Sequence, residues 1–280
     1  MRVRSNPHTV KGNHREPHGR QPRRYQDIHR KRHQMRRGRM SQWYMLTIPK
    51  SATSKKQLRL IFDECDVKKY IIAKEKGKNG YEHYQIRVES SRPDFFDYVH
   101  DRIPQSHIIK AESDSFDYER KEGHFWTSED NPEILKVRFG KPNKLQKKIL
   151  KELMKQSDRG IDVWYDPNGS HGKSWLSIHL WEHGKALVVP RYACTPEKLS
   201  AFVCSAYKGE PIIIIDIPRA RKPTEELYEA MEELKDGLVF DPRYQGRTRN
   251  IRGAKILVFT NHKLNLKLLS YDRWNLHTAK

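Results

Sequence analysis

The chain has 280 residues and a formal net charge of +20 at pH 7, so it is long enough for two ordinary domains and favours an anionic polymer as its partner. Its three cysteines show no CxxC spacing, which argues against a zinc ribbon and against a disulfide framework. The longest aliphatic run, 211–218, is too short to span a bilayer, and we expect a soluble, intracellular protein without a membrane partner.

Residues 1–40 form a basic arm with thirteen Lys and Arg against two acidic residues. The arm has almost no large aliphatic side chains to offset chain entropy by burial, so we predict that it is disordered and binds a polyanion. Two basic clusters, Arg23-Arg24 and 29–39, are also candidates for a nuclear import signal, which would place the protein in the nucleus of a eukaryotic host. A merely solubilising tail is the alternative.

From Ser41 onward, apolar patterns predict alternating strands and helices. Strands are expected at 43–49, 67–75, 81–89 and 107–112, and helices at 55–65, 94–103 and 115–123. This order predicts a compact α+β domain over residues 41–127. Residues 128–144 are rich in turn formers and are interpreted as a linker.

Beyond the linker, apolar segments predict a parallel α/β sheet with buried strands. A helix is expected at 145–154, and strands at 161–166, 211–217 and 255–260. We therefore assign residues 145–280 to a second domain.

In the third predicted strand, alternate side chains share a face, so His83, Gln85 and Arg87 point away from the apolar residues between them. The apolar face is expected to meet the core, which leaves His83 and Gln85 on an open polar face. An imidazole nitrogen and an amide oxygen suit a divalent ion such as Mg²⁺ or Mn²⁺. Glu75, across the turn, is the candidate third ligand. Glu82 is an alternative, but alternation places it on the core side.

The predicted helix at 115–123 carries Tyr118 and Lys121 three residues apart, hence on one helical face. A tyrosine hydroxyl can attack phosphorus when a metal polarises the phosphate. A nearby lysine can neutralise charge or assist proton transfer. The H-x-Q and Y-x-x-K patterns are both common in proteins. Either pattern taken alone would be interpreted as structural.

Residues 164–175 follow a predicted strand and precede a predicted helix, as a phosphate-binding loop does. The residues that fit such a loop are Gly169, Gly172, Lys173 and Ser174. Lys173 would meet the outer phosphates of ATP, and Ser174 would hold Mg²⁺. Asp166 and Pro167 depart from the simplest G-x4-G-K-[ST] pattern, and a simple turn is the alternative.

Two later strands end in residues that would complete a nucleotide site. Asp216 ends an aliphatic strand and is expected to serve Mg²⁺, and Asn261 is placed to sense a γ-phosphate. Ile217 stands where many ATPases have a second acid, so the base that activates water is unassigned. Between these strands lies a basic segment around a glycine, read as a hairpin that grips DNA or, alternatively, as a solvated charged hairpin. Its arginines are Arg243, Arg247, Arg249 and Arg252.

The motifs YMLTIP, HYQ, YERK, GSHGKS, IIIID and VFTN follow one another in this chain. In this order they resemble the replication initiators (Rep) of circular, Rep-encoding single-stranded DNA viruses, in which an HUH-type rolling-circle endonuclease domain precedes a P-loop superfamily 3 helicase domain. The resemblance covers roughly residues 41–275, and within the group it is closest to smacovirus-like Reps. The fold it implies is a five-stranded antiparallel sheet with helices, joined to a P-loop domain that assembles into a hexameric ring.

The resemblance also implies a role for each motif residue. Tyr118 would be the nucleophile, Lys121 its motif partner, and Glu75, His83 and Gln85 the metal ligands. Attack at the origin would leave a 5′-phosphotyrosyl link and a free 3′-OH for a host replication polymerase. The final 3′-OH could then attack the link and reseal the circle. Single-stranded DNA, an origin hairpin and further copies of the chain are the implied partners.

In the second domain, the resemblance implies an ATP site and a helicase activity. The motif residues would be Lys173, Ser174, Asp216 and Asn261. Arg273 is our prediction for an arginine finger that acts across a ring interface, with Arg252 as its competitor.

Three other interpretations stay open. A nucleic-acid-stimulated NTPase with a non-catalytic DNA-binding N-terminal domain would make Tyr118 an ordinary tyrosine. A structural nucleic-acid-packaging protein would leave Lys173 and Ser174 unexplained. A plasmid-type initiator has the same mechanism, and the sequence does not separate it from a viral one.

Overall fold

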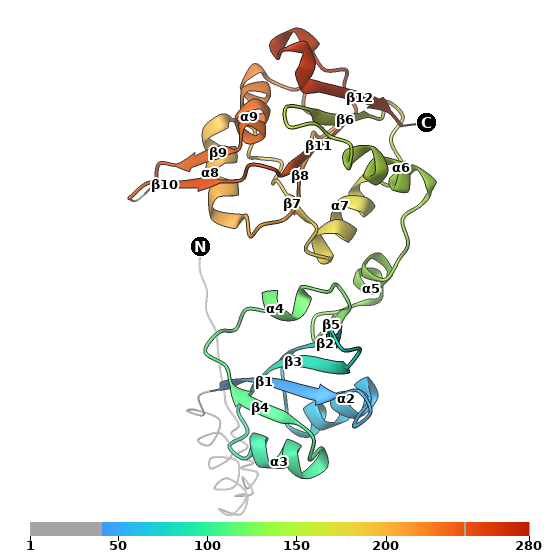
Figure 1. Ribbon diagram of the computed structural model, residues 1–280, viewed down its shortest axis with the longest axis vertical. Coiled ribbons are helices and arrows are strands. Elements are labelled where there is room, and N and C mark those ends of the chain that lie inside the picture. Colours follow the sequence, from blue (N-terminus) through green and yellow to red (C-terminus); the bar gives the residue numbers. More distant parts are fainter. Residues whose placement is uncertain (1–40, 244, 280) are drawn as a thin grey trace, which may run out of the picture. The chain divides into compact units, whose positions relative to one another are not determined.

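The computed structural model describes residues 41–243 and 245–279 (Figure 1). The prediction for the basic arm, residues 1–40, lies outside the described residues. Among the helices that are described, none combines the length and the apolar composition needed to cross a lipid bilayer.

Within the described residues, an N-terminal sheet of five antiparallel strands has the order β4-β1-β3-β2-β5. The strands are β1 (Gln42–Pro49), β2 (Lys69–Lys76), β3 (Glu82–Ser90), β4 (His107–Lys110) and β5 (Phe125–Thr127). The first four confirm the predicted strands. The sequence did not reveal β5, because three residues are too few to display an alternating pattern.

Two helices cover one face of this sheet, α2 (Lys55–Glu64) and α3 (Phe95–Arg102). They pack on the apolar side chains that alternate along the central strand β3, and Tyr84, Ile86 and Val88 all belong to this core. A capping box, in which Ser54 and Gln57 exchange hydrogen bonds, sets the start of α2. The predicted core face of β3 is therefore confirmed.

The sequence predicts that the opposite face of the sheet is open, but in the structure this face is covered. Gln85 and Arg87 are both buried. A short helix, α4 (Asp117–Arg120), contacts β2 and β3 on this side, and Phe116 packs on a small apolar cluster with Ile71 and Phe125. Burial of this face is what brings α4 against the polar side chains of β3.

The segment interpreted as a linker contains a helix, α5 (Pro132–Arg138). Asn131 caps its N-terminus by accepting a hydrogen bond from the backbone N–H of Ile134, and Pro132 occupies the first turn. Both residues are turn formers that also start helices, so the composition of 128–144 was ambiguous.

Within the described residues, a second sheet has five parallel strands in the order β12-β6-β11-β8-β7. The strands are β6 (Ile161–Tyr165), β7 (Ala186–Val188), β8 (Ile212–Asp216), β11 (Lys255–Thr260) and β12 (Trp274–Thr278). This parallel sheet confirms the predicted α/β architecture. It also confirms the predicted strands β6, β8 and β11.

Helices cover both faces of the parallel sheet (Figure 1). The helices are α6 (Lys144–Leu153), α7 (Lys173–Glu182), α8 (Pro196–Ala206) and α9 (Glu225–Asp236). Along β8, Ile213 and Ile215 meet the core under α8 and α9, while Ile212 and Ile214 meet the core under α6 and α7. A run of consecutive isoleucines thus satisfies two cores at once, as expected for a parallel strand.

The remaining elements are a two-stranded hairpin and two short 3₁₀ turns. They are β9 (Leu238–Asp241), β10 (Arg247–Asn250), η1 (Leu266–Leu268) and η2 (Tyr271–Arg273). The hairpin confirms that the basic segment after α9 turns back on itself.

Candidate functional site

The two strands of the β2–β3 hairpin place Glu75 directly opposite His83. Glu75 Oε2 lies 3.7 Å from His83 Nε2, and the Glu75 side chain is only 5% exposed. Glu75 Oε1 and His83 Nδ1 are buried and have no hydrogen-bond partner within the part of the chain that the structure describes. Buried polar atoms without partners are rare, and Glu75 Oε1 is free to bind a metal.

Gln85 lies two residues further along the same face of β3. Its side chain is buried, and its Oε1 accepts a hydrogen bond of 2.9 Å from Thr47 Oγ1. Thr47, a residue of the YMLTIP motif, is the cross-strand neighbour of Gln85 on β1. An amide oxygen has two lone pairs, so Thr47 can orient Gln85 and leave one lone pair for a metal.

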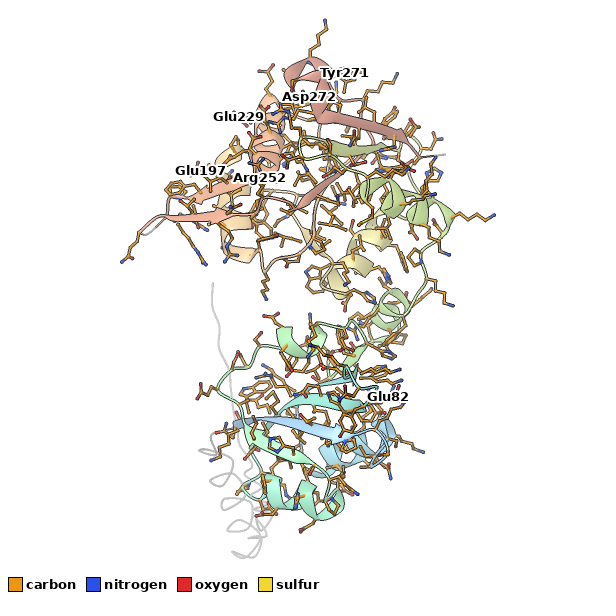
Figure 2. All side chains as sticks on the ribbon, in the orientation of Figure 1. Glu82, Glu197, Glu229, Arg252, Tyr271 and Asp272 are labelled. Carbon is orange, nitrogen blue, oxygen red and sulfur yellow. The ribbon has the colours of Figure 1, made fainter. Side chains whose placement is uncertain are left out.

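Glu82, the alternative ligand, does not join this group. It pairs instead with Lys50 and Lys74, and its side chain is partly exposed (Figure 2). The sequence placed it on the core side of β3, but at the start of a strand the alternation no longer decides burial.

Helix α4 brings Lys121 and Tyr118 to the same place. Lys121 Nζ lies 2.9 Å from Glu75 Oε2 and 3.7 Å from the centre of the Tyr118 ring. Partial burial alone would lower the pKa of Lys121, but hydrogen bonds to Glu75 and Tyr118 outweigh it and raise the pKa. Lys121 is therefore a cation at neutral pH, and the half-exposed Tyr118 stands next to it.

A carboxylate, an imidazole and an amide oxygen are a donor set that fits Mg²⁺ or Mn²⁺. Among residues 41–243 and 245–279, no three His, Cys, Asp or Glu side chains gather as metal ligands. A metal bound by Glu75 and His83 would thus depend on Gln85 as its third ligand from the chain. The unpartnered Glu75 Oε1 supports this fit.

The second group of predicted residues lines a cavity of about 510 Å³ at the carboxyl ends of the parallel strands. The predicted residues in its wall are Gly169, Gly172, Lys173, Ser174, Asp216 and Asn261. The loop before α7 has a left-handed backbone at Gly169 (φ 78°) and Gly172 (φ 76°), where glycine is favoured. The structure thus brings all six residues together.

Asp166, noted above only as a departure from a pattern, organises this loop. Its completely buried carboxylate accepts hydrogen bonds from the Gly169 amide (2.7 Å) and His171 Nδ1 (2.9 Å), and it pairs with Lys173. Burial alone would raise the pKa of Asp166, but the bonds from Lys173, His171 and Gly169 hold it below its ordinary value. The backbone carbonyl of Asp166 also accepts from the side chain of Asn261.

Two arginines that we did not predict also line the cavity. Arg191 Nη2 lies 2.6 Å from Asp216 Oδ2, and Arg219 Nη2 donates to the carbonyl of Asn168 at 3.0 Å. Arg219 follows shortly after the end of β8, and this position could have identified it as a residue of the cavity. Arg191 reaches the site only because parallel strands end at one edge, and no local pattern marks it.

The structure does not place Arg273 where an arginine finger is needed. Its side chain is 3% exposed, and its guanidinium bonds Asp236 (2.6 Å) and Glu232 (3.2 Å) of α9. A residue that must reach a neighbouring subunit has to project from the surface, and Arg273 braces η2 against α9 instead. Arg252, its competitor, is exposed and pairs with Asp158 (Figure 2).

The predicted DNA-gripping arginines lie on or beside the β9–β10 hairpin. The guanidinium of Arg243 donates two hydrogen bonds to Asp241 and its backbone N–H a third, and together they hold the pKa of that carboxyl at about 2. Arg249 donates to the carbonyl of Tyr207, and Arg247 is exposed at the start of β10. Arg252 lies beyond the hairpin. The segment therefore forms a hairpin, but Arg243 and Arg249 bond to other groups of the protein.

No family model matches the chain. Over 128 residues it is 27% identical to the master replication protein of Banana bunchy top virus, and over 125 residues it is 26% identical to that of Subterranean clover stunt virus. The resemblance to viral replication initiators is confirmed. These matches cover 45% and 44% of this chain but only 42% and 41% of the two viral proteins. The finer likeness to smacovirus Reps stays a prediction.

Proposed function

We propose that this chain is a rolling-circle replication initiator that cuts single-stranded DNA at an origin and rejoins it. The observation that carries the proposal is the meeting of Glu75, Lys121 and Tyr118, with 2.9 Å between Lys121 Nζ and Glu75 Oε2. Both viral relatives are named master replication proteins, which supports the same function.

In the proposed reaction, Tyr118 Oη attacks a phosphodiester phosphorus in line with the bond to the 3′ oxygen. The phenol loses its proton to solvent, the new O–P bond forms, and the 3′ oxygen leaves and takes up a proton. A divalent metal held by Glu75, His83 and Gln85 would polarise a phosphate oxygen. Lys121 stays protonated, so it would stabilise the phenolate and the phosphate as a cation.

The phosphotyrosyl link keeps the free energy of the cleaved bond. A later 3′-OH can therefore attack the same phosphorus, displace Tyr118 and reseal the DNA without ATP. This reversibility is the reason for a tyrosine nucleophile in place of water.

For the second domain, residues 145–280, we propose ATP binding and hydrolysis by a superfamily 3 helicase that works as a hexameric ring on DNA. The cavity of about 510 Å³, with Lys173, Ser174 and Asp216 in its wall, supports an ATP and Mg²⁺ site. Location in a host nucleus and engagement of a host polymerase belong to the same proposal.

A labelled stem-loop oligonucleotide with Mg²⁺ or Mn²⁺ tests the endonuclease. We expect a DNA adduct on a denaturing gel that is absent with EDTA and in Tyr118→Phe. Tyr271→Phe is the matched control, because Tyr271 is exposed and far along the chain from the site (Figure 2). If no adduct forms on a panel of hairpins while ATP is hydrolysed, the chain is instead a nucleic-acid-stimulated NTPase with a non-catalytic N-terminal domain.

A further inference from the structure

The face of β3 that holds the metal-ligand candidates continues to a third polar residue, Arg87. Its side chain is about nine-tenths buried, and its Nε donates to Glu119 Oε1 at 3.0 Å. A second nitrogen, Nη1, donates to the carbonyl of Ser113 at 2.6 Å. Arg87 thus links the central strand β3 to Ser113, which precedes α4, and to Glu119, which lies within α4.

Glu119 is the residue after Tyr118, and it is completely buried. Burial raises the pKa of Glu119, and the charge of Glu75 adds to this effect, against the opposing influence of Arg87. Neither the metal nor DNA is expected to touch Glu119, because its side chain points into the protein. A buried carboxylate that the proposed chemistry does not use calls for another role.

Helix α4 cannot hold its own position. It has four residues, and its N-cap residue Phe116 makes no side-chain cap. A single helical turn is unstable in isolation, because nucleation fixes several residues for one hydrogen bond. Tertiary contacts must therefore fix α4, and the structure offers three polar ones: Lys121 to Glu75, Glu119 to Arg87, and the exposed ion pair of Asp117 with Lys208.

The Asp117–Lys208 pair is exposed, and exposed ion pairs contribute little to stability. The other two contacts differ in kind. The Lys121–Glu75 contact involves a metal-ligand candidate, so a bound metal or DNA would change it. The Glu119–Arg87 contact is buried and contains none of the metal-ligand candidates, and Glu119 is adjacent to the nucleophile. Consecutive residues on a helix point about 100° apart, which lets Glu119 face the sheet while Tyr118 faces outward.

We propose that the Arg87–Glu119 ion pair is the positioning device that holds Tyr118 beside Lys121 and Glu75. The pair fixes the rotation and height of α4 on β3, so the phenol oxygen is placed by a contact that does not change during the reaction. The proposal rests on the proposed endonuclease function, and its test separates the two.

Amide hydrogen exchange, measured without DNA or metal, tests the anchoring alone. In Glu119→Gln we expect faster exchange over residues 117–121, while the strands of the N-terminal sheet keep their protection. Asp94→Asn is the control, because it breaks the exposed ion pair of Arg92 and Asp94 in the same domain. Unchanged exchange over 117–121 in Glu119→Gln would overturn the anchoring, whether or not the protein cuts DNA.

Single-turnover cleavage of the stem-loop tests the positioning. We expect Glu119→Gln to lower the rate by on the order of 10²-fold, because a displacement of about 1 Å has this effect on an aligned reaction. The dissociation constants for the oligonucleotide and for Mn²⁺ should stay unchanged. A rate equal to that of the wild type would refute the positioning role. A wild type that does not cut would refute the proposed function and leave the exchange result standing.

A double variant separates positioning from stability. A buried charge without its partner destabilises the fold, but replacing both members with apolar side chains restores much of the stability. We expect Arg87→Met/Glu119→Leu to melt closer to the wild type than Glu119→Leu does, yet to cleave as slowly. Recovery of the cleavage rate together with the melting temperature would show that the pair is only structural.

Discussion

Glu75 is the residue on which the candidate endonuclease site depends. Its Oε2 meets both Lys121 and His83, and its Oε1 has no partner among the described residues. The sequence identified Glu75 because a short turn must place it across from His83. It could not show that Lys121 would arrive at the same oxygen, since that contact joins residues 46 positions apart along the chain.

The first prediction compares two neighbouring carboxylates. Glu75→Gln should weaken Mn²⁺ binding by at least about 10-fold, because it removes a charged ligand. Glu82→Gln should leave the affinity unchanged, because Glu82 pairs with Lys50 on the surface. Isothermal titration calorimetry with Mn²⁺ measures both. An equal loss of affinity in the two variants would place the metal elsewhere.

The second prediction concerns the charge on Lys121. The raised pKa keeps this amine protonated at every pH below its ordinary value of 10.5, so its expected contribution is a positive charge that disappears only at higher pH. Lys121→Arg should therefore retain much of the cleavage rate, and Lys121→Met should abolish it. Single-turnover rates from pH 7 to 9 measure this. Proton transfer by Lys121 would be indicated if the arginine variant were as slow as the methionine variant.

At the scale of elements, sequence patterns found most strands of the two sheets and the helices α2, α3, α6 and α7. They missed α8 and α9, although these are the longest described helices, and they missed short elements that depend on their neighbours. The isoleucine run of β8 is readable without a structure, because a buried parallel strand is apolar on both sides. Helix α5 was hidden among residues that serve equally as turn formers and as caps. The burial of Gln85 and Arg87 was unpredictable, because it follows from the docking of α4.

The third prediction concerns the loop before α7. Gly172 has φ 76°, and an added Cβ would lie 2.6 Å from Gln146 Nε2, which donates to the Gly172 carbonyl. Gly172→Ala should therefore lower stability by about 1–2 kcal/mol and also remove most of the ATP affinity. Gly184→Ala is the control: its φ is 60° and its Cβ would meet open space. Chemical denaturation and fluorescent-ATP titration measure the two effects. Retained ATP affinity in Gly172→Ala would contradict the assignment of the loop.

At the scale of the whole molecule, the order of the motifs was more informative than any single motif. It led to both sheets, to the residues that meet at Glu75, and to six of the residues that line the cavity before α7. The prediction for Arg273 failed to find support because a sequence does not show burial, and the acids of α9 that hold it lie 37 to 41 residues earlier. Arg191 and Arg219, which line the cavity, were not predicted, because a sequence does not show which distant residues the fold brings together.

The fourth prediction uses the charge distribution. The thirteen Lys and Arg of residues 1–40 precede β1, which begins at Gln42. Deleting 1–40 should therefore weaken binding to single-stranded DNA and flatten its salt dependence, by about 0.7 in log K per log salt for each phosphate that the arm had neutralised. Fluorescence anisotropy at several salt concentrations measures the slope. An unchanged slope would mean that the arm does not bind DNA.

The position of β12 has a consequence for how the protein is made. All strands of the N-terminal sheet precede Ser128, whereas the parallel sheet places β12 beside β6, the strand that leads into the phosphate loop. At a synthesis rate of about 5–20 residues per second, the ribosome needs about 8–30 seconds to pass from Thr127 to Thr278. During that time the tyrosine and its neighbouring carboxylate can already be assembled on the nascent chain, while for most of it β6 still lacks both of its flanking strands, β11 and β12.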